Sequence, residues 1–160
     1  MIDCTFENGN KAKTGLRHCV VDTLVIDESK ILLVKRAPNL LNGGKYGLIG
    51  GFVDRDETTK QAVIREAREE TGYDVDPFLL LRIADNPNRP QEDRQNIAFV
   101  YVAKAIKKTG TGDNESSEAT WFDLHSLPPR DQFAFDHYEN IELYLKYQKE
   151  KLKIPVVGEI

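Results

Sequence analysis

Three glutamates lie within five residues of one another in the stretch GGFVDRDETTKQAVIREAREETGYDV, which covers residues 50–75. At about 100° per residue, Glu66, Glu69 and Glu70 fall on the same half of a helix as the apolar Ala62. Like charges at i and i+4 repel each other, so Glu66 and Glu70 need positive charge beside them. Carboxylate oxygens are the hard ligands that Mg²⁺ or Mn²⁺ prefers. The pattern therefore favours a divalent cation site.

Capping residues predict the helix that would hold these glutamates. Asp56 or Thr58 can serve as the N-cap, and Gly72 stands where a left-handed C-terminal cap belongs. We therefore expect a helix from about Thr58 to Thr71.

Arg65 is a basic residue next to the glutamates on this helix. The helical wheel places it on the other side, from which it can pair with Glu69 at i, i+4. A single arginine on that flank does not neutralise three carboxylates, so the pattern still favours a metal ion.

Hydrophobic runs on both sides of the helix predict an α/β domain. The first two runs are separated by the turn residues Asp-Glu-Ser and predict a hairpin, and residues 38–52 predict a glycine-rich loop with a short strand. Residues 133–152 predict a terminal helix that Pro155 ends. The main expected strands are residues 17–26, 30–37, 78–84, 96–106 and 120–124.

Composition indicates one globular domain over residues 1–160, with 40% hydrophobic and 30% charged residues. The net charge of −4 argues against nucleic-acid binding, and an anionic substrate would need a metal. The polar N-terminus and the absence of a long apolar run favour the cytoplasm and no membrane contact. Cys4 and Cys19 are too few for a disulfide framework, so we expect reduced thiols.

The helix and its N-terminal loop resemble the signature of the Nudix hydrolases, G-x₅-E-x₇-R-E-U-x-E-E-x-G-U, where U is a bulky aliphatic residue. Ala67 and Tyr73 depart from the U positions, and Ile49 and Asp56 replace a frequent proline and a frequent glycine in the loop. The resemblance implies a Nudix α/β/α sandwich with a mixed sheet and a loop-helix-loop site. The seven fixed positions are filled by Gly51, Glu57, Arg65, Glu66, Glu69, Glu70 and Gly72.

Nudix hydrolases cleave a nucleoside diphosphate linked to another group, with divalent ions on the phosphates. The resemblance implies that Glu66, Glu69 and Glu70 bind Mg²⁺ or Mn²⁺ and that Gly51 lets the main chain pass close to the metal. It also implies that Glu57 is a nearby ligand or an orienting acid, and that Arg65 holds the glutamates in place.

The general base is not determined by this signature. Glu69 or Glu70 could serve, but a carboxylate already bound to metal accepts a proton poorly. The loop GTGDNESSEATWF offers Glu115 and Glu118 near the same site, and we favour Glu115.

The regions outside the signature are similar to small ADP-ribose pyrophosphatases. Arg36, Arg89 and Arg94 are expected to contact phosphate or ribose, and Phe133 or Phe135 to stack on adenine. We interpret His18 and His137 as structural, because the sequence marks no group of ligands around either.

The expected reaction is hydrolysis of ADP-ribose to AMP and ribose 5-phosphate, by an enzyme that could form a homodimer as related enzymes commonly do. Nucleoside triphosphates and dinucleoside polyphosphates are alternative substrates. A regulator that binds ADP-ribose without cleaving it is a further alternative, which the complete set of glutamates disfavours.

Overall fold

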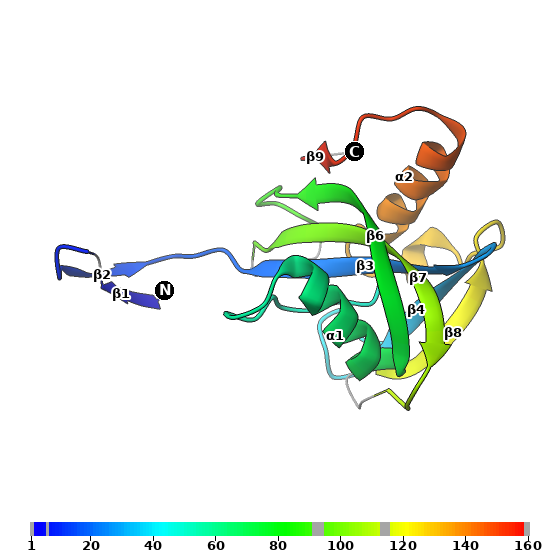
Figure 1. Cartoon of the computed structure of the whole chain (residues 1–160), viewed down its shortest axis with the longest axis horizontal. Helices are drawn as coiled ribbons and strands as arrows, with labels where there is room; N and C mark the ends of the chain where they lie inside the picture. The colour runs from blue at the N-terminus through cyan, green and yellow to red at the C-terminus, as the bar shows by residue number, and fades with distance from the viewer. Residues whose placement is uncertain (1, 6, 91–94, 113–115, 159–160) are drawn as a thin grey trace.

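A mixed β-sheet with one long helix on each face forms the body of the protein, as the computed structural model shows (Figure 1). The structure describes residues 2–5, 7–90, 95–112 and 116–158. The helices are α1 (Thr59–Thr71) and α2 (His137–Lys149), with a short 3-10 helix, η1, at Arg130–Gln132. The strands are β1 (Ile2–Thr5), β2 (Lys11–Thr14), β3 (Cys19–Asp27), β4 (Lys30–Arg36), β5 (Tyr46–Gly47), β6 (Tyr73–Ala84), β7 (Ile97–Lys108), β8 (Ser116–Asp123) and β9 (Val156–Val157).

The main sheet has the order β5-β4-β3-β7-β6-β9, and β8 pairs with β4 along its other edge, from Lys30 to Arg36. The β3–β4 hairpin is antiparallel as expected, whereas β3 and β7 are parallel. This mixed sheet confirms the predicted α/β fold.

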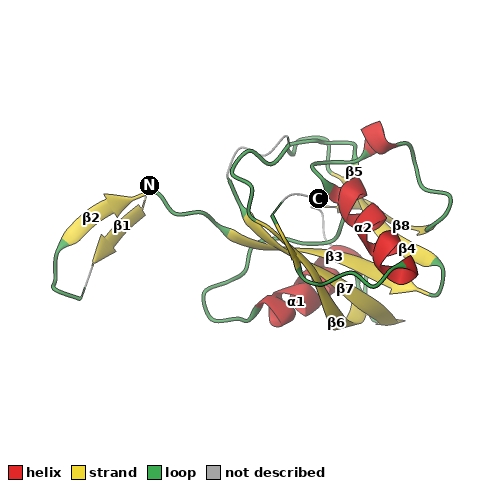
Figure 2. Cartoon of the chain, turned by 90° about the horizontal axis from the view of Figure 1, so that it is seen from above, coloured by secondary structure: helices red, strands yellow, loops and turns green. Residues whose placement is uncertain are grey.

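The two faces of the sheet carry separate hydrophobic clusters, because successive side chains of a strand point to opposite faces. On one face, Val25 and Leu32 pack with Ala62 and Val63 of α1. The opposite face places Leu24, Ile26, Ile31 and Leu33 against Ile141 and Leu143 of α2. Figure 2 shows the two helices on opposite sides of the strands, so the α/β/α sandwich is confirmed.

Three features of the strands differ from the sequence prediction. Strand β6 begins at Tyr73 rather than at Phe78, and irregular pairing beside Pro77 lets this residue, which cannot donate to the ladder, stay within the strand. Strand β8 begins at Ser116, so Glu118 lies on a strand and not on a loop. The short β9 pairs in parallel with β6, where we expected no strand.

The β1–β2 hairpin was also not predicted, and it forms its own two-stranded sheet apart from the main one (Figures 1 and 2). A single domain over residues 1–160 remains a prediction. Among the described residues, no helix combines the length and hydropathy needed to cross a lipid bilayer.

Candidate active site

Reciprocal capping sets the start of α1 at the edge of the site. The Thr58 hydroxyl accepts a hydrogen bond from the Gln61 backbone N–H, and the Gln61 side chain accepts one from the Thr58 backbone N–H. Gly72 ends the helix in the left-handed conformation with φ of 73°. Of the two predicted N-caps, Thr58 is therefore the one used, and the predicted extent of the helix is confirmed.

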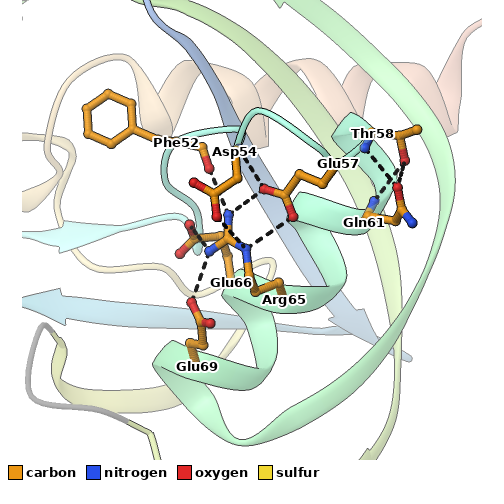
Figure 3. Close-up of polar contacts among 8 residues, drawn as sticks. All are labelled: Phe52, Asp54, Glu57, Thr58, Gln61, Arg65, Glu66 and Glu69. Carbon is orange, nitrogen blue, oxygen red and sulfur yellow. Dashed lines mark hydrogen bonds and ion pairs between the residues drawn. The ribbon is translucent and has the colours of Figure 1, made fainter.

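Arg65 lies at the centre of a cluster of four carboxylates, those of Asp54, Glu57, Glu66 and Glu69 (Figure 3). Its guanidinium donates to Glu57 Oε1 at 2.6 Å, to Glu66 Oε1 at 2.8 Å and to Glu69 Oε2 at 3.0 Å. A fourth bond, of 2.8 Å, reaches the carbonyl of Phe52 in the preceding loop. The expected pair with Glu69 is thus present, and the same side chain also reaches Glu57 and Glu66.

These contacts shift the pKa of both partners. The hydrogen bond from Arg65 holds the pKa of Glu57 below its usual range, and the bond to Glu57 is also the largest cause of the raised pKa of Arg65. Both side chains are therefore held in their charged forms. Arg65 links the loop before α1, which carries Glu57, to the later turns of the helix, which carry Glu66 and Glu69.

Two glycines let the loop before α1 approach the glutamates. The Gly50 N–H donates to Glu70 Oε2 at 3.2 Å. A Cβ on Gly51 would meet the carboxylate of Glu66, and a Cβ on Gly50 would meet the backbone carbonyl of Val21 on β3. Because Gly51 has no side chain, there is space around Glu66. Because Gly50 has none, the loop packs closely against β3.

A pocket of about 520 Å³ gathers most of the predicted site residues. The predicted glutamates of α1 border it together with Arg65, and residues from β4 and from the start of α2 line it as well. The predicted residues in its wall are Arg36, Gly51, Arg65, Glu66, Glu69, Glu70, Arg89 and Phe135.

Among the described residues, the predicted Glu57, Glu118 and Phe133 do not line this pocket. Glu57 is bonded to Arg65, which lines the pocket, and it borders a smaller cavity beside α1. Glu118 is exposed on β8 opposite Lys35 of β4. Arg94 and Glu115 lie outside the described residues.

A buried charge network lies at the pocket, which its members Asp22 and Arg89 line, and its two acids were not predicted from the sequence. Arg89 donates to Asp22 Oδ2 at 2.6 Å and to Asp136 Oδ1 at 2.8 Å, and Arg82 donates to Asp136 Oδ2 at 2.8 Å. Asp22 interrupts the apolar strand CVVDTLVID, and Asp136 lies among apolar residues in FAFDH. A lone acid in a buried run is a signal of this kind of pairing, because burying an unpaired charge is costly.

The environment of Asp22 favours its charged form. Burial raises the pKa of the Asp22 carboxyl, but the Arg89 guanidinium and the contact with His137 outweigh burial and hold this pKa well below its usual range. The charges of Asp22 and Asp136 in turn raise the pKa of Arg89 against the effect of burial. Arg89, expected on the sequence to meet phosphate or ribose, is thus only 5% exposed and bonded to two acids.

His137 lies beside two acids that the sequence did not mark as its neighbours, Asp22 and Asp136. It offers a ligand atom within 4.8 Å of those of Asp22 and Asp136, the spacing of a cation site. However, its Nδ1 accepts the Leu48 N–H at 2.9 Å, and arginines already pair with both carboxylates. The positive charge of this group is therefore supplied by the protein itself.

The two candidate phenylalanines have different surroundings. Phe133 is 3% exposed and belongs to the core on the α2 side, so its expected stacking on adenine is wrong. Phe135 lies in the pocket wall with the guanidinium groups of Arg36 and Arg89 at 5.1 and 5.6 Å from its ring centre. This geometry is that of cation–π contacts.

The glutamate end of the pocket fits a divalent cation. Its donors are carboxylate oxygens, which suit Mg²⁺ or Mn²⁺, and Gly51 leaves around Glu66 the space that a side chain would fill. Each carboxylate has about four lone-pair positions, so the bonds from Arg65 and Gly50 do not use the full accepting capacity of these acids.

Comparison with known proteins agrees with this geometry. Residues 16–144 match the NUDIX domain. An ADP-ribose pyrophosphatase of Methanocaldococcus jannaschii is 35% identical over 128 residues, which are 80% of this chain and 73% of that protein. An 8-oxo-dGDP phosphatase of Danio rerio is 33% identical over 138 residues, or 82% of this chain, which spans only 39% of that relative.

A solved NUDIX hydrolase from Nitrosomonas europaea has the same fold, with a TM-score of 0.79, 23% identity, and coverage of 95% of this chain and 82% of that one. The site described above therefore lies on the fold and on the sequence signature of one family. The chain belongs to the Nudix hydrolases and is a pyrophosphohydrolase.

Proposed function

We propose that the protein hydrolyses ADP-ribose to AMP and ribose 5-phosphate. One observation carries the proposal: a single pocket is lined both by the glutamates of α1 and by the cationic, aromatic group of Arg36, Arg89 and Phe135. ADP-ribose, a diphosphate between two ribose groups, has the negative charge that a bound cation and arginines would attract and the adenine ring that Phe135 would contact. The 35% identity to an ADP-ribose pyrophosphatase supports the same substrate.

In this proposal Glu66, Glu69 and Glu70 hold Mg²⁺ or Mn²⁺, with Glu57 and Arg65 orienting them. The ion would polarise the phosphate oxygens and stabilise the departing phosphate charge. One water molecule is consumed, its oxygen forms a bond to phosphorus, and one P–O bond of the diphosphate breaks. Glu115 accepts the proton of this water, while Arg36, Arg94 and Phe135 contact the substrate, and Arg89 contributes through its place behind Phe135.

The experiment is incubation of the protein and Mg²⁺ or Mn²⁺ with ADP-ribose, 8-oxo-dGDP, deoxynucleoside triphosphates and dinucleoside polyphosphates, with identification of the products. We expect the highest kcat/KM for ADP-ribose, with AMP and ribose 5-phosphate as products. A preference for triphosphates with release of pyrophosphate would overturn the substrate assignment.

A Glu70→Gln variant tests the metal assignment in the same assay. The change removes one charge from a repelling group but keeps its shape, so the fold should remain while turnover falls by about a hundredfold or more. Activity that survives thorough chelation, or a Glu70→Gln variant as fast as the parent, would contradict the proposed cation site.

A further inference from the structure

Phe135 has a backbone conformation that a bulky residue rarely adopts. Its φ is 53°, in the left-handed region, where a side chain of this size is strained. Such conformations persist only where the surrounding structure holds them, and they concentrate at functional sites. The contacts that hold Phe135 at the pocket are made by its neighbours in the chain.

The residues on both sides of Phe135 are fixed by buried contacts. Before it, Phe133 is packed in the core, and the Ala134 N–H donates to the Tyr46 carbonyl at 2.9 Å. After it, Asp136 is 5% exposed and bonded to two arginines, and His137 accepts the Leu48 N–H.

Asp136 also holds the guanidinium of Arg89, which contacts the Phe135 ring. Its Oδ1 accepts from Arg89 Nε at 2.8 Å, and the guanidinium of Arg89 is the one that lies 5.6 Å from the Phe135 ring centre. Arg82 is held from the far side, because its Nε and Nη2 donate to the Gly158 carbonyl at 3.1 and 2.9 Å. Asp136 therefore connects the C-terminal segment, the β6 strand and the pocket wall.

We propose that Asp136 is a positioning residue for substrate recognition, acting through Arg89 and through the backbone to hold Phe135 against the pocket. The inference rests on the proposed function only in taking the pocket as the substrate site. Asp136 does not border the glutamate end, so its loss should weaken substrate binding rather than the chemical step.

The first test is Asp136→Asn, which keeps the shape of the side chain but removes its charge. We expect the KM for ADP-ribose to rise about tenfold or more and kcat to stay within about twofold, because displacement of a binding group mainly lowers affinity. Glu139→Gln is the control on the same helix, since Glu139 pairs with the exposed Arg130 at the surface.

A double variant separates positioning from simple stabilisation of the fold. Asn140 Oδ1 accepts from the same Arg82 Nη1 at 2.8 Å, and its Nδ2 has no hydrogen-bond partner among the described residues. Asp136→Asn with Asn140→Asp therefore returns the negative charge to Arg82 without returning it to Arg89. We expect thermal stability to recover while the KM stays raised.

Two results would overturn the inference: an unchanged KM in Asp136→Asn, or a KM that recovers together with stability in the double variant. If Asp136→Asn alone does not fold, the double variant supplies the measurement. If the parent protein cleaves another diphosphate better than ADP-ribose, the proposed function fails, and the same KM comparison is made on that better substrate.

Discussion

Arg65 shows how one side chain can hold several acids of a candidate site together. Three carboxylates on one helix and its leading loop would repel each other, and a guanidinium with five donors in a fixed fork bonds all three at once. Its fourth contact, to the Phe52 carbonyl, ties the loop to the helix. These contacts require the forked shape of the guanidinium as well as its positive charge.

Arg65→Lys should therefore impair the enzyme although the charge is kept. A lysine ammonium is a compact point charge and does not reproduce the forked contacts. We expect kcat/KM to fall about tenfold or more, and the free energy of unfolding to fall by ~1–2 kcal/mol, since the side chain is partly exposed. Steady-state kinetics and urea unfolding measure the two effects. A lysine variant with full activity would show that the geometry of the guanidinium is unimportant.

The assignment of the base is a second prediction at this scale. Glu115→Gln should lower kcat by about a hundredfold to ten-thousandfold, the usual value of a positioned carboxylate base, with little change in Mn²⁺ affinity. Glu118→Gln is the matched control, because Glu118 is exposed on β8 and does not border the pocket. If Glu118→Gln is the slow variant, the assignment moves to Glu118. If both variants keep the full rate, the base must be sought among Glu69, Glu70, Glu92 and Asp93.

Among the structural elements, the loop before α1 depends on two glycines that have different neighbours. A Cβ at Gly50 would collide with the Val21 carbonyl, which belongs to a central strand and does not yield. The collision at Gly51 would be with the end of the Glu66 side chain, which can rotate away. Gly50 therefore allows close packing against the sheet, and Gly51 leaves space for the Glu66 carboxylate.

Gly50→Ala and Gly51→Ala should separate stability from activity. We expect Gly50→Ala to lower the free energy of unfolding by ~1–3 kcal/mol, as overpacking commonly does. Gly51→Ala should unfold like the parent but lose about tenfold or more in kcat/KM, because Glu66 must move. Thermal unfolding and initial rates decide between these outcomes. Equal stability losses in both variants, with activity retained, would contradict the distinction.

The sequence predicted α1 almost to the residue because its signals are local: the capping box at Thr58 and the left-handed Gly72 both lie within its own ends. Strand β9 could not be predicted in this way, because two residues become a strand only through pairing with β6. The roles of Asp22 and Asp136 were missed for the same reason. The role of each buried acid depends on an arginine that is distant in the sequence, so the acid alone does not reveal it.

Across the whole molecule, the buried network joins the loop after β6 and the start of α2 to strands of the main sheet. Asp22 is on β3, Arg82 on β6, Arg89 on the loop after β6, and Asp136 at the start of α2. Removing one member of a buried ion pair leaves an uncompensated charge in the interior. The network therefore links the stability of the fold to the shape of the pocket that Asp22 and Arg89 line.

The pH dependence of stability tests this coupling at Asp22. Its pKa lies below the ordinary value of 3.8, so its contribution to folding is complete well above pH 3.8 and is lost as pH falls through the lower pKa of the folded state. Asp22→Asn should lower the free energy of unfolding at pH 7 by ~3–5 kcal/mol, and this difference from the parent should shrink as the pH is lowered below about 4. Urea unfolding of both proteins between pH 7 and pH 3 measures the difference, with Asp131→Asn on the exposed η1 as the control that should change little. An equal difference at both ends of this range would show that the charge of Asp22 does not hold the network together.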